Sequence, residues 1–138
     1  MADKKYVYVE TVSVTKIFDS KYKSKLQACI KNMMEKAINA SSKLTTKPPA
    51  DKKAGGYYAS LNLVALEKEQ KGNKINLNAE ISKFIGTWPD KRLLTAKSSS
   101  SATLEGADPN KLDKEVERAV GDLMEAVADT VVNFLEKL

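Results

Sequence analysis

Two alternating segments joined by a short turn constrain the fold of this chain more than any other feature. Between Tyr57 and Leu66, and again after Gly72-Asn73, apolar residues occupy every second position. Successive side chains of a strand point to opposite faces, so this period places the apolar groups on one face of each strand. The pattern predicts a β-hairpin whose inner face carries Tyr57, Ala59, Leu61, Leu63 and Ala65, then Ile75, Leu77, Ala79 and Ile81.

Further strands are predicted on either side of the hairpin. Tyr6 to Val14 is rich in β-branched and aromatic residues on both faces, which is typical of a central strand. Phe84 to Pro89 interrupts the alternation, and Gly86 there indicates a bulge or a turn. Arg92 to Glu105 then predicts a third strand, in which Ser98–Ser101 are expected on an exposed sheet edge.

Two helices are predicted from apolar stripes of period 3.6. Asp19 or Ser20 offers an N-cap to a helix of about twenty residues. Asp108-Pro109, an N-cap followed by proline at the first helical position, begins a second helix over 109–138. At 1.5 Å per residue this helix is roughly 45 Å long, longer than a small sheet covers, so its far end is expected to project and pack on another chain. Its stripe comprises Leu112, Val116, Ala119, Val120, Leu123, Val127, Val131, Phe134 and Leu138.

The order of these elements, β-α-β-β-β-α, predicts an α+β fold with two long helices packed on one face of a mixed or antiparallel sheet. The length of 138 residues suits a single domain over residues 1–138. Residues 41–56 contain Pro48-Pro49, Lys52-Lys53 and Gly55-Gly56, so they are expected to form a basic loop.

The residue types present exclude most catalytic and metal chemistry. The chain has no histidine and one cysteine, Cys29. An intramolecular disulfide, a Ser-His-Asp or Cys-His arrangement and the usual zinc sites are therefore excluded. We expect that the chain is not an enzyme, that it has no catalytic or metal-binding residue, and that it binds no cofactor.

The cellular compartment follows only from the sequence as written. No apolar run reaches the roughly 18 residues that a membrane-spanning helix requires. Met1-Ala2-Asp3 leads directly into a strand-like segment without an apolar signal region. A cytoplasmic location is expected for the chain as written, and a periplasmic one if a leader was removed before it.

Charge is unevenly distributed along the chain. Residues 1–107 hold 19 lysine and arginine residues against 10 acidic ones, whereas residues 108–138 hold 4 against 8. Such asymmetry indicates either a basic face for anionic partners or two faces that attract each other, within the fold or between copies. The candidate anion-binding residues are Lys21, Lys23, Lys25, Lys52 and Lys53. Because nearly all the cations are lysine, whereas recognition of bases and phosphates favours arginine, nucleic-acid binding is the alternative rather than the leading hypothesis.

Several segments together resemble a group of small bacterial envelope proteins. They are the first strand with its lysine-rich helix, the segment Gly-Gly-Tyr57-Tyr58-Ala-Ser-Leu-Asn-Leu, the hairpin to Lys74-Ile-Asn-Leu-Asn-Ala-Glu and the capped final helix. The group contains the penicillin-binding-protein activator LpoB and the TolB N-terminal domain. The resemblance implies a non-enzymatic docking module of the periplasm, often lipid-anchored. It lies in element order and strand pattern, so it assigns no functional residue.

The leading hypothesis is a non-enzymatic protein-interaction or assembly module. Its partner is a protein, which includes a second copy of the chain, because opposite charges on the two parts suit self-association. The predicted contact surface is the sheet edge from Ala96 to Leu104 or the end of the final helix. Trp88, beside a turn, is either a lid on the core or an anchor for a partner. The candidate partner-binding residues are Trp88, Val127, Val131, Phe134 and Leu138.

Overall fold

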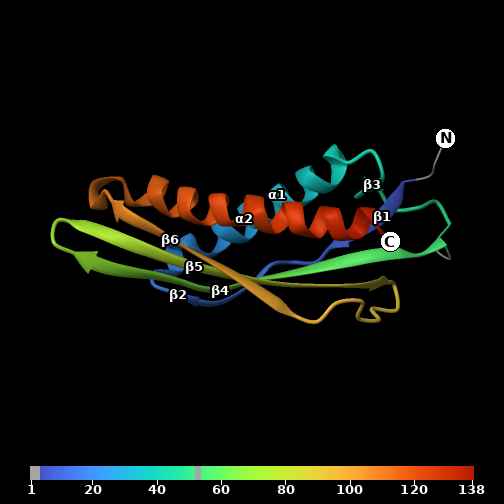
Figure 1. The fold of residues 1–138 in the computed structure, drawn as a ribbon, viewed down its shortest axis with the longest axis horizontal. Helices are drawn as coiled ribbons and strands as arrows, with labels where there is room; N and C mark the ends of the chain where they lie inside the picture. Colours follow the sequence, from blue (N-terminus) through green and yellow to red (C-terminus); the bar gives the residue numbers. More distant parts are fainter. Residues whose placement is uncertain (1–3, 52–53) are drawn as a thin grey trace.

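The protein consists of one sheet with two helices on one of its faces (Figure 1), as seen in a computed structural model that describes residues 4–51 and 54–138. This arrangement confirms the predicted α+β fold. The helices are α1 (Lys23–Ala40) and α2 (Leu112–Glu136), each preceded by a 3-10 turn, Ser20–Tyr22 and Pro109–Lys111. The strands are β1 (Lys5–Val9), β2 (Ser13–Ile17), β3 (Leu44–Thr45), β4 (Gly56–Lys71), β5 (Lys74–Trp88) and β6 (Ser98–Ala107).

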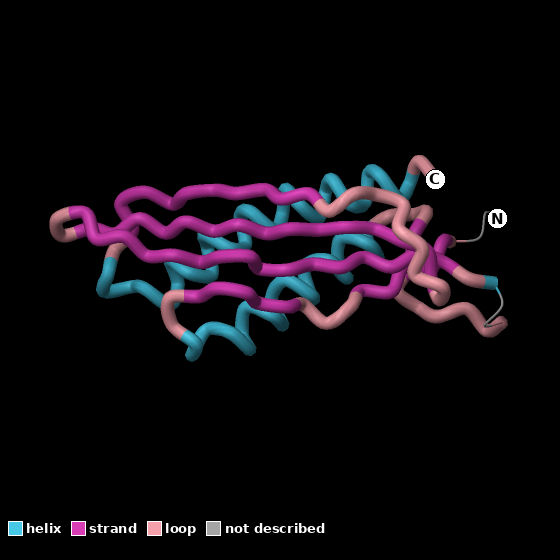
Figure 2. The backbone as a smooth tube through the Cα atoms, turned by 90° about the horizontal axis from the view of Figure 1, so that it is seen from below, coloured by secondary structure: helices cyan, strands magenta, loops and turns pink. Residues whose placement is uncertain are grey.

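The sheet is mixed. Its strand order is β3-β1-β4-β5-β6, and β2 continues beside β4 beyond the end of β1. β1 pairs in parallel with β3 and β4, and β2 pairs in parallel with β4. The β4–β5 and β5–β6 pairs are antiparallel. Viewed from below, the strands lie in front of both helices, so the second face of the sheet carries no helix (Figure 2). We call this second face the open face.

The predicted hairpin forms β4 and β5, with Gly72 in the turn at a φ of 62°. Its second strand is as predicted, because Ile75, Leu77, Ala79 and Ile81 are all buried. The first strand departs at its end. A register shift between Leu63 and Ala65 turns Leu66, rather than Ala65, toward the helices, and Leu66 is fully buried.

The expected interruption at Phe84–Pro89 was wrong, because β5 continues to Trp88. Gly86 lies inside the strand, where a β-carbon would come within 2.2 Å of Cε1 of Tyr58. Glycine is therefore present to admit the Tyr58 ring, and not to turn the chain.

The predicted strand Tyr6–Val14 is divided into β1 and β2. Ala59 pairs with Val9 and Asn62 pairs with Ser13, so the N-terminal segment contains one residue more than β4 over this stretch. The extra residue shifts the alternation and buries Val12 on the same side as Val9.

The predicted strand from Arg92 starts late. β6 begins at Ser98, and before it only Leu93 forms an isolated bridge, to Gly86. Ser98–Ser101 do lie in the edge strand, as predicted. In the loop predicted over 41–56, Leu44–Thr45 form the short edge strand β3, and Leu44 is fully buried.

The predicted caps lie at the 3-10 turns that lead into the helices, so the second α-helix covers Leu112–Glu136 and not the whole of 109–138. The Asp19 carboxylate accepts a hydrogen bond from the Lys21 N–H at 3.0 Å, and the Asp108 carboxylate accepts one from the Asn110 N–H at 2.9 Å. Within the described residues, no helix has both the length and the apolar character to cross a membrane.

The expectation that α2 projects beyond the sheet was wrong. β5 has 15 residues, which span roughly 50 Å, whereas the 25 residues of α2 span roughly 37 Å. The sheet is therefore long enough to support the whole helix, and α2 lies along it (Figure 1). The core between the sheet and the helices includes Leu26, Ile30, Met34, Leu61, Leu63, Leu77, Ile81, Val120, Met124, Val127, Val131 and Leu135.

Candidate interaction surface

β6 forms one edge of the sheet, and within the described residues no strand pairs with its outer side. The residues Ser98–Leu104 are small or uncharged, and Glu105 is the first charged residue of the strand. A bulge follows, where Gly106 has a φ of 67°. Unpaired backbone N–H and C=O groups on a sheet edge can pair with another strand, and natural proteins usually guard such edges with lysine, proline or bulges. Ser98–Leu104 has none of these guards.

The opposite edge is guarded. It consists of β3, with two residues, and of β1 and β2, with five residues each. The irregular segment between β1 and β2 is covered by α1, because Gln27 Nε2 donates a hydrogen bond to the carbonyl oxygen of Val12 at 2.7 Å. β2 also contains Lys16, which forms an ion pair with Glu67 at 3.3 Å. The two edges therefore differ in their capacity to add a strand.

A small groove lies beside the first residue of β6. It has a volume of about 130 Å³ and lies between β5, the segment before β6 and the end of α2. Ser98 stands at this groove, and Lys83 Nζ donates a hydrogen bond to Ser98 Oγ at 3.1 Å. The groove is lined by Lys83, Ile85, Thr95, Ser98, Thr130 and Phe134.

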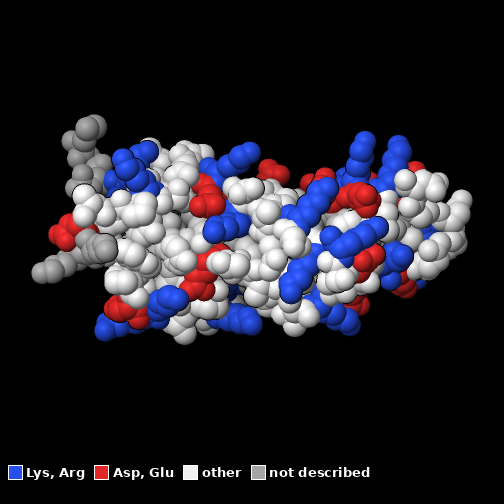
Figure 3. Space-filling view, turned by 180° about the vertical axis from the view of Figure 1, so that it is seen from behind, with Lys and Arg blue, Asp and Glu red and all other residues white. Residues whose placement is uncertain are grey.

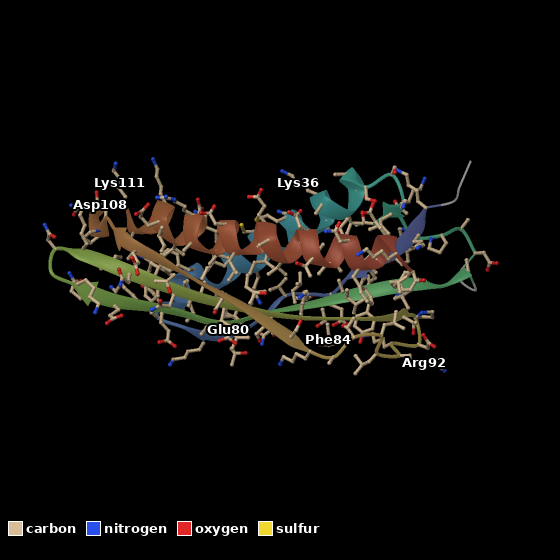
Figure 4. The ribbon with its side chains drawn as sticks, viewed as in Figure 1. Lys36, Glu80, Phe84, Arg92, Asp108 and Lys111 are labelled. Carbon is tan, nitrogen blue, oxygen red and sulfur yellow. The ribbon has the colours of Figure 1, made fainter. Side chains whose placement is uncertain are left out.

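Two pairs of aromatic side chains lie outside the core beneath the helices. Tyr6 and Trp88 pack edge to face with ring centroids 4.8 Å apart, and Tyr58 and Phe84 do the same at 5.8 Å. Tyr6 and Tyr58 are buried but do not belong to the core beneath the helices. Figure 4 shows Phe84 on the side of the sheet away from the helices. Trp88 therefore packs on Tyr6, and not on the main core.

The loop between β5 and β6 crosses the open face of the sheet (Figure 2). Lys91 Nζ lies 5.9 Å from the centre of the Tyr58 ring and forms an ion pair with Glu10 at 2.9 Å. Beyond this contact the loop exposes Leu93 by 61% and Leu94 by 39%. The exposure of these two leucines was not predicted, because both fall within the strand expected over Arg92 to Glu105.

The predicted partner-binding residues of α2 fall into two groups. Val127 and Val131 are buried in the core of the chain, so their expected role as contact surface was wrong. The cause is the length of the sheet, which covers this part of the helix. Phe134 is partly buried and lines the groove beside Ser98, whereas Leu138 is 45% exposed.

The structure brings only some of the predicted anion-binding lysines together. Lys25 forms an ion pair with Glu117 of α2, and Lys21 Nζ lies 5.0 Å from the centre of the Tyr22 ring. Lys23 is exposed, and Lys52 and Lys53 lie outside the described residues. On the face that Figure 3 shows, lysine and arginine side chains are interspersed with acidic ones. Opposite charges from the basic and acidic parts of the chain therefore pair within the fold, between Lys25 of α1 and Glu117 of α2.

The two helices are also joined through a tyrosine. Tyr22 Oη donates a hydrogen bond to Asp113 Oδ1 at 2.6 Å. Burial of the Tyr22 ring, together with this bond and the charge of Asp113, raises the pKa of Tyr22 to about 12. At the other end of the pair, Ser41 Oγ donates to Glu136 Oε2 at 2.8 Å. These contacts hold α2 in place, so its end is not free to leave the sheet.

Cys29 lies half-buried on α1. Burial, and to a lesser degree the charge of Glu117, raises the pKa of its thiol. A raised pKa lowers the fraction of thiolate at neutral pH, so this thiol is a weaker nucleophile there than a fully exposed cysteine.

The fold is shared with solved structures of bacterial proteins. One is a protein of the family DUF330 from Xanthomonas campestris, 12% identical, with a TM-score of 0.59 over 97% of this chain and 85% of that one. A second is a PelC dodecamer from Paraburkholderia phytofirmans, 12% identical, with a TM-score of 0.56 over 92% and 88%. A third is a minor lipoprotein from Acinetobacter baumannii, 7% identical, with a TM-score of 0.50 over 91% of each chain.

At these identities the likeness shows a common fold alone. It agrees with the predicted resemblance to small bacterial envelope proteins, whereas the specific resemblance to LpoB and TolB stays a prediction. No protein-family model and no curated protein matches the sequence.

Proposed function

We propose that this chain is a non-enzymatic module of the bacterial cell envelope that assembles with copies of itself. The observation that carries the proposal is the β6 edge, where Ser98–Leu104 present an unpaired backbone without a charged residue. An edge of this kind is a template for strand addition. A chain whose opposite edge is guarded, and whose β6 edge is not, has one side suited to a partner strand.

The neighbours with the same fold add support for the envelope and for assembly. One of them is a minor lipoprotein, and another is described as a dodecamer. Neither description names an enzyme. The same observations favour the periplasm over the cytoplasm as the compartment of the mature chain.

The test is the molar mass in solution, measured by multi-angle light scattering over a series of protein concentrations at low and high salt. The proposal predicts a dimer or a larger assembly that persists in high salt, because backbone pairing and apolar contact are not screened by ions as exposed charges are. A chain that stays monomeric at the highest concentration and at both salt levels contradicts the proposal.

Nucleic-acid binding has weaker support. Of its five predicted residues, Lys25 is paired with Glu117 and Lys52 and Lys53 lie outside the described residues. This alternative predicts binding that weakens steeply as salt rises. A gel-shift titration with single- and double-stranded DNA and RNA at low salt tests it, and a lack of any shift removes it.

A further inference from the structure

We infer that two copies of the chain join by antiparallel pairing of their β6 strands about a two-fold axis at Ser101. The inference rests on the proposed function, since it specifies which edge and which symmetry self-assembly uses. Three observations lead to it: the faces to which the β6 side chains point, the groove beside Ser98 and the charges at the two ends of the strand.

The faces of β6 follow from its pairing with β5. Ser100 pairs with Ile81 and Leu104 pairs with Leu77, and both partners belong to the core under the helices. Even-numbered residues from Ser98 to Leu104 therefore point to the helix side, and odd-numbered ones to the open face. Two copies that keep their helices on the same side of a continuous sheet must pair even with even and odd with odd. A two-fold axis that passes through a residue satisfies this condition.

Placing the axis at Ser101 brings Leu104 of one copy opposite Ser98 of the other. Leu104 is the largest apolar side chain between Ser98 and Glu105, and it is only partly buried within its own chain. Ser98 stands at the groove of about 130 Å³ that Ile85, Thr130 and Phe134 line. In this register the exposed part of Leu104 thus meets an apolar groove of the second copy, and the reciprocal contact forms at the other end.

The same register pairs the charges that flank the uncharged segment. Lys97 immediately precedes β6 and Glu105 lies near its end, and both are exposed. With the axis at Ser101, Lys97 of each copy lies opposite Glu105 of the other. Moving the axis by one residue in either direction removes these opposite-charge pairs. A positive and a negative side chain that face each other on neighbouring strands attract. These charges therefore favour one register on an edge whose small uncharged residues would allow several.

Cysteine cross-linking tests the register directly. In a Cys29→Ala background, Ser101→Cys places two thiols across the axis, within the 4.4–6.8 Å between Cα atoms that a disulfide accepts in proteins generally. Mild oxidation is expected to give a covalent dimer from Ser101→Cys alone. Chains with Ser99→Cys are expected to link to chains with Thr103→Cys in a mixture, and neither is expected to link to itself. Ser42→Cys, an exposed serine after α1, is the matched control for random collision.

Charge reversal provides a second measurement that needs no cysteine. Lys97→Glu and Glu105→Lys are each expected to raise the dissociation constant of the dimer about tenfold, because each creates two like-charge pairs across the axis. The double variant Lys97→Glu/Glu105→Lys restores opposite charges and is expected to return the constant to near the wild-type value. Analytical ultracentrifugation measures all four chains.

The outcomes separate this inference from the proposed function. A monomer under all conditions overturns both. An assembly that forms without the Ser101 cross-link, or in which the double charge reversal does not restore affinity, overturns the β6 pairing and leaves self-assembly standing. A covalent dimer through Ser101, together with restored affinity in the double variant, supports the pairing.

Discussion

The ring of Tyr58 lies against the backbone of Gly86, so close that a β-carbon at position 86 would come within 2.2 Å of Tyr58 Cε1 and within 2.8 Å of the Arg92 carbonyl oxygen. Tyr58 and Gly86 are directly paired in the β4–β5 ladder. The glycine thus creates the space in which the Tyr58 ring packs, with Phe84 edge to face against it.

Gly86→Ala is expected to lower the free energy of unfolding by about 2 kcal/mol, because overpacking forces the Tyr58 ring or the loop backbone to move. Urea denaturation followed by circular dichroism measures the change. Gly121→Ala is the matched control: Gly121 lies within α2 with open space around it, so alanine is expected to stabilise the protein by about 0.5–1 kcal/mol. Equal effects of the two substitutions would contradict the packing seen at Gly86.

Tyr22→Phe is expected to lower stability at neutral pH by about 1 kcal/mol, since it removes the hydrogen bond to Asp113. The pH dependence has a definite sign. Because the folded pKa is raised from 10.0 to about 12, the contribution is full below pH 10 and is lost as pH rises through 12.

Denaturation at pH 7, 10 and 11.5 therefore distinguishes wild type from the variant, whose stability is expected to fall less over this range. Tyr8→Phe, which removes the hydroxyl of an exposed tyrosine, provides the control. An identical alkaline decline in wild type and Tyr22→Phe would show that another group governs it.

Two leucines three positions apart test whether the end of α2 belongs to the core. Leu135 is fully buried and Leu138 is 45% exposed. Leu135→Ala is expected to cost about 3 kcal/mol of stability, and Leu138→Ala less than about 0.5 kcal/mol. Thermal and chemical denaturation check both values. A small effect at Leu135 would mean that the end of the helix does leave the sheet.

The Cys29 thiol is expected to react slowly with iodoacetamide at pH 8, about tenfold more slowly in the native protein than in the unfolded one. Burial raises its pKa and restricts access to the sulfur. Mass spectrometry of quenched samples, with and without denaturant, gives the two rates. Comparable rates would show that the thiol is accessible and ionised in the native protein.

Ser101→Lys is expected to weaken self-association by at least about tenfold, because a charged side chain at the centre of the β6 edge opposes pairing. Ser42→Lys adds the same charge to an exposed serine far along the chain from β6 and is expected to leave the molar mass unchanged. Light scattering at several concentrations compares the two. If both variants weaken assembly equally, net charge and not the β6 edge is responsible.

The elements that were predicted correctly are those whose signal lies in their own residues or in residues a few positions away. Ile75 to Ile81 alternate because one face of β5 is buried, and the period is visible without knowing what covers it. Asp19 and Asp108 cap the 3-10 turns that lead into α1 and α2, through bonds that span two residues. The predicted edge position of Ser98–Ser101 followed in the same way from a run of small polar residues.

Features that depend on distant residues were not predictable. In the sequence, Gly86 indicates a turn. In the structure, the Tyr58 ring of the neighbouring strand lies against it and explains the glycine. Val127 and Val131 had the pattern of a contact surface because the length of the sheet beneath them was underestimated. The exposure of Leu93 and Leu94 likewise depends on β6 beginning only at Ser98.

The sequence by itself determined the fold class, the hairpin, both helix caps and the absence of histidine chemistry. Each depends on residue types or on bonds between residues a few positions apart. Only the tertiary structure decided which face of each element is covered, where Trp88 packs and which of the two sheet edges is unguarded. The physical reason is that burial is a property of what lies opposite a residue, and in this sheet the opposing residues come from strands and helices far away along the chain.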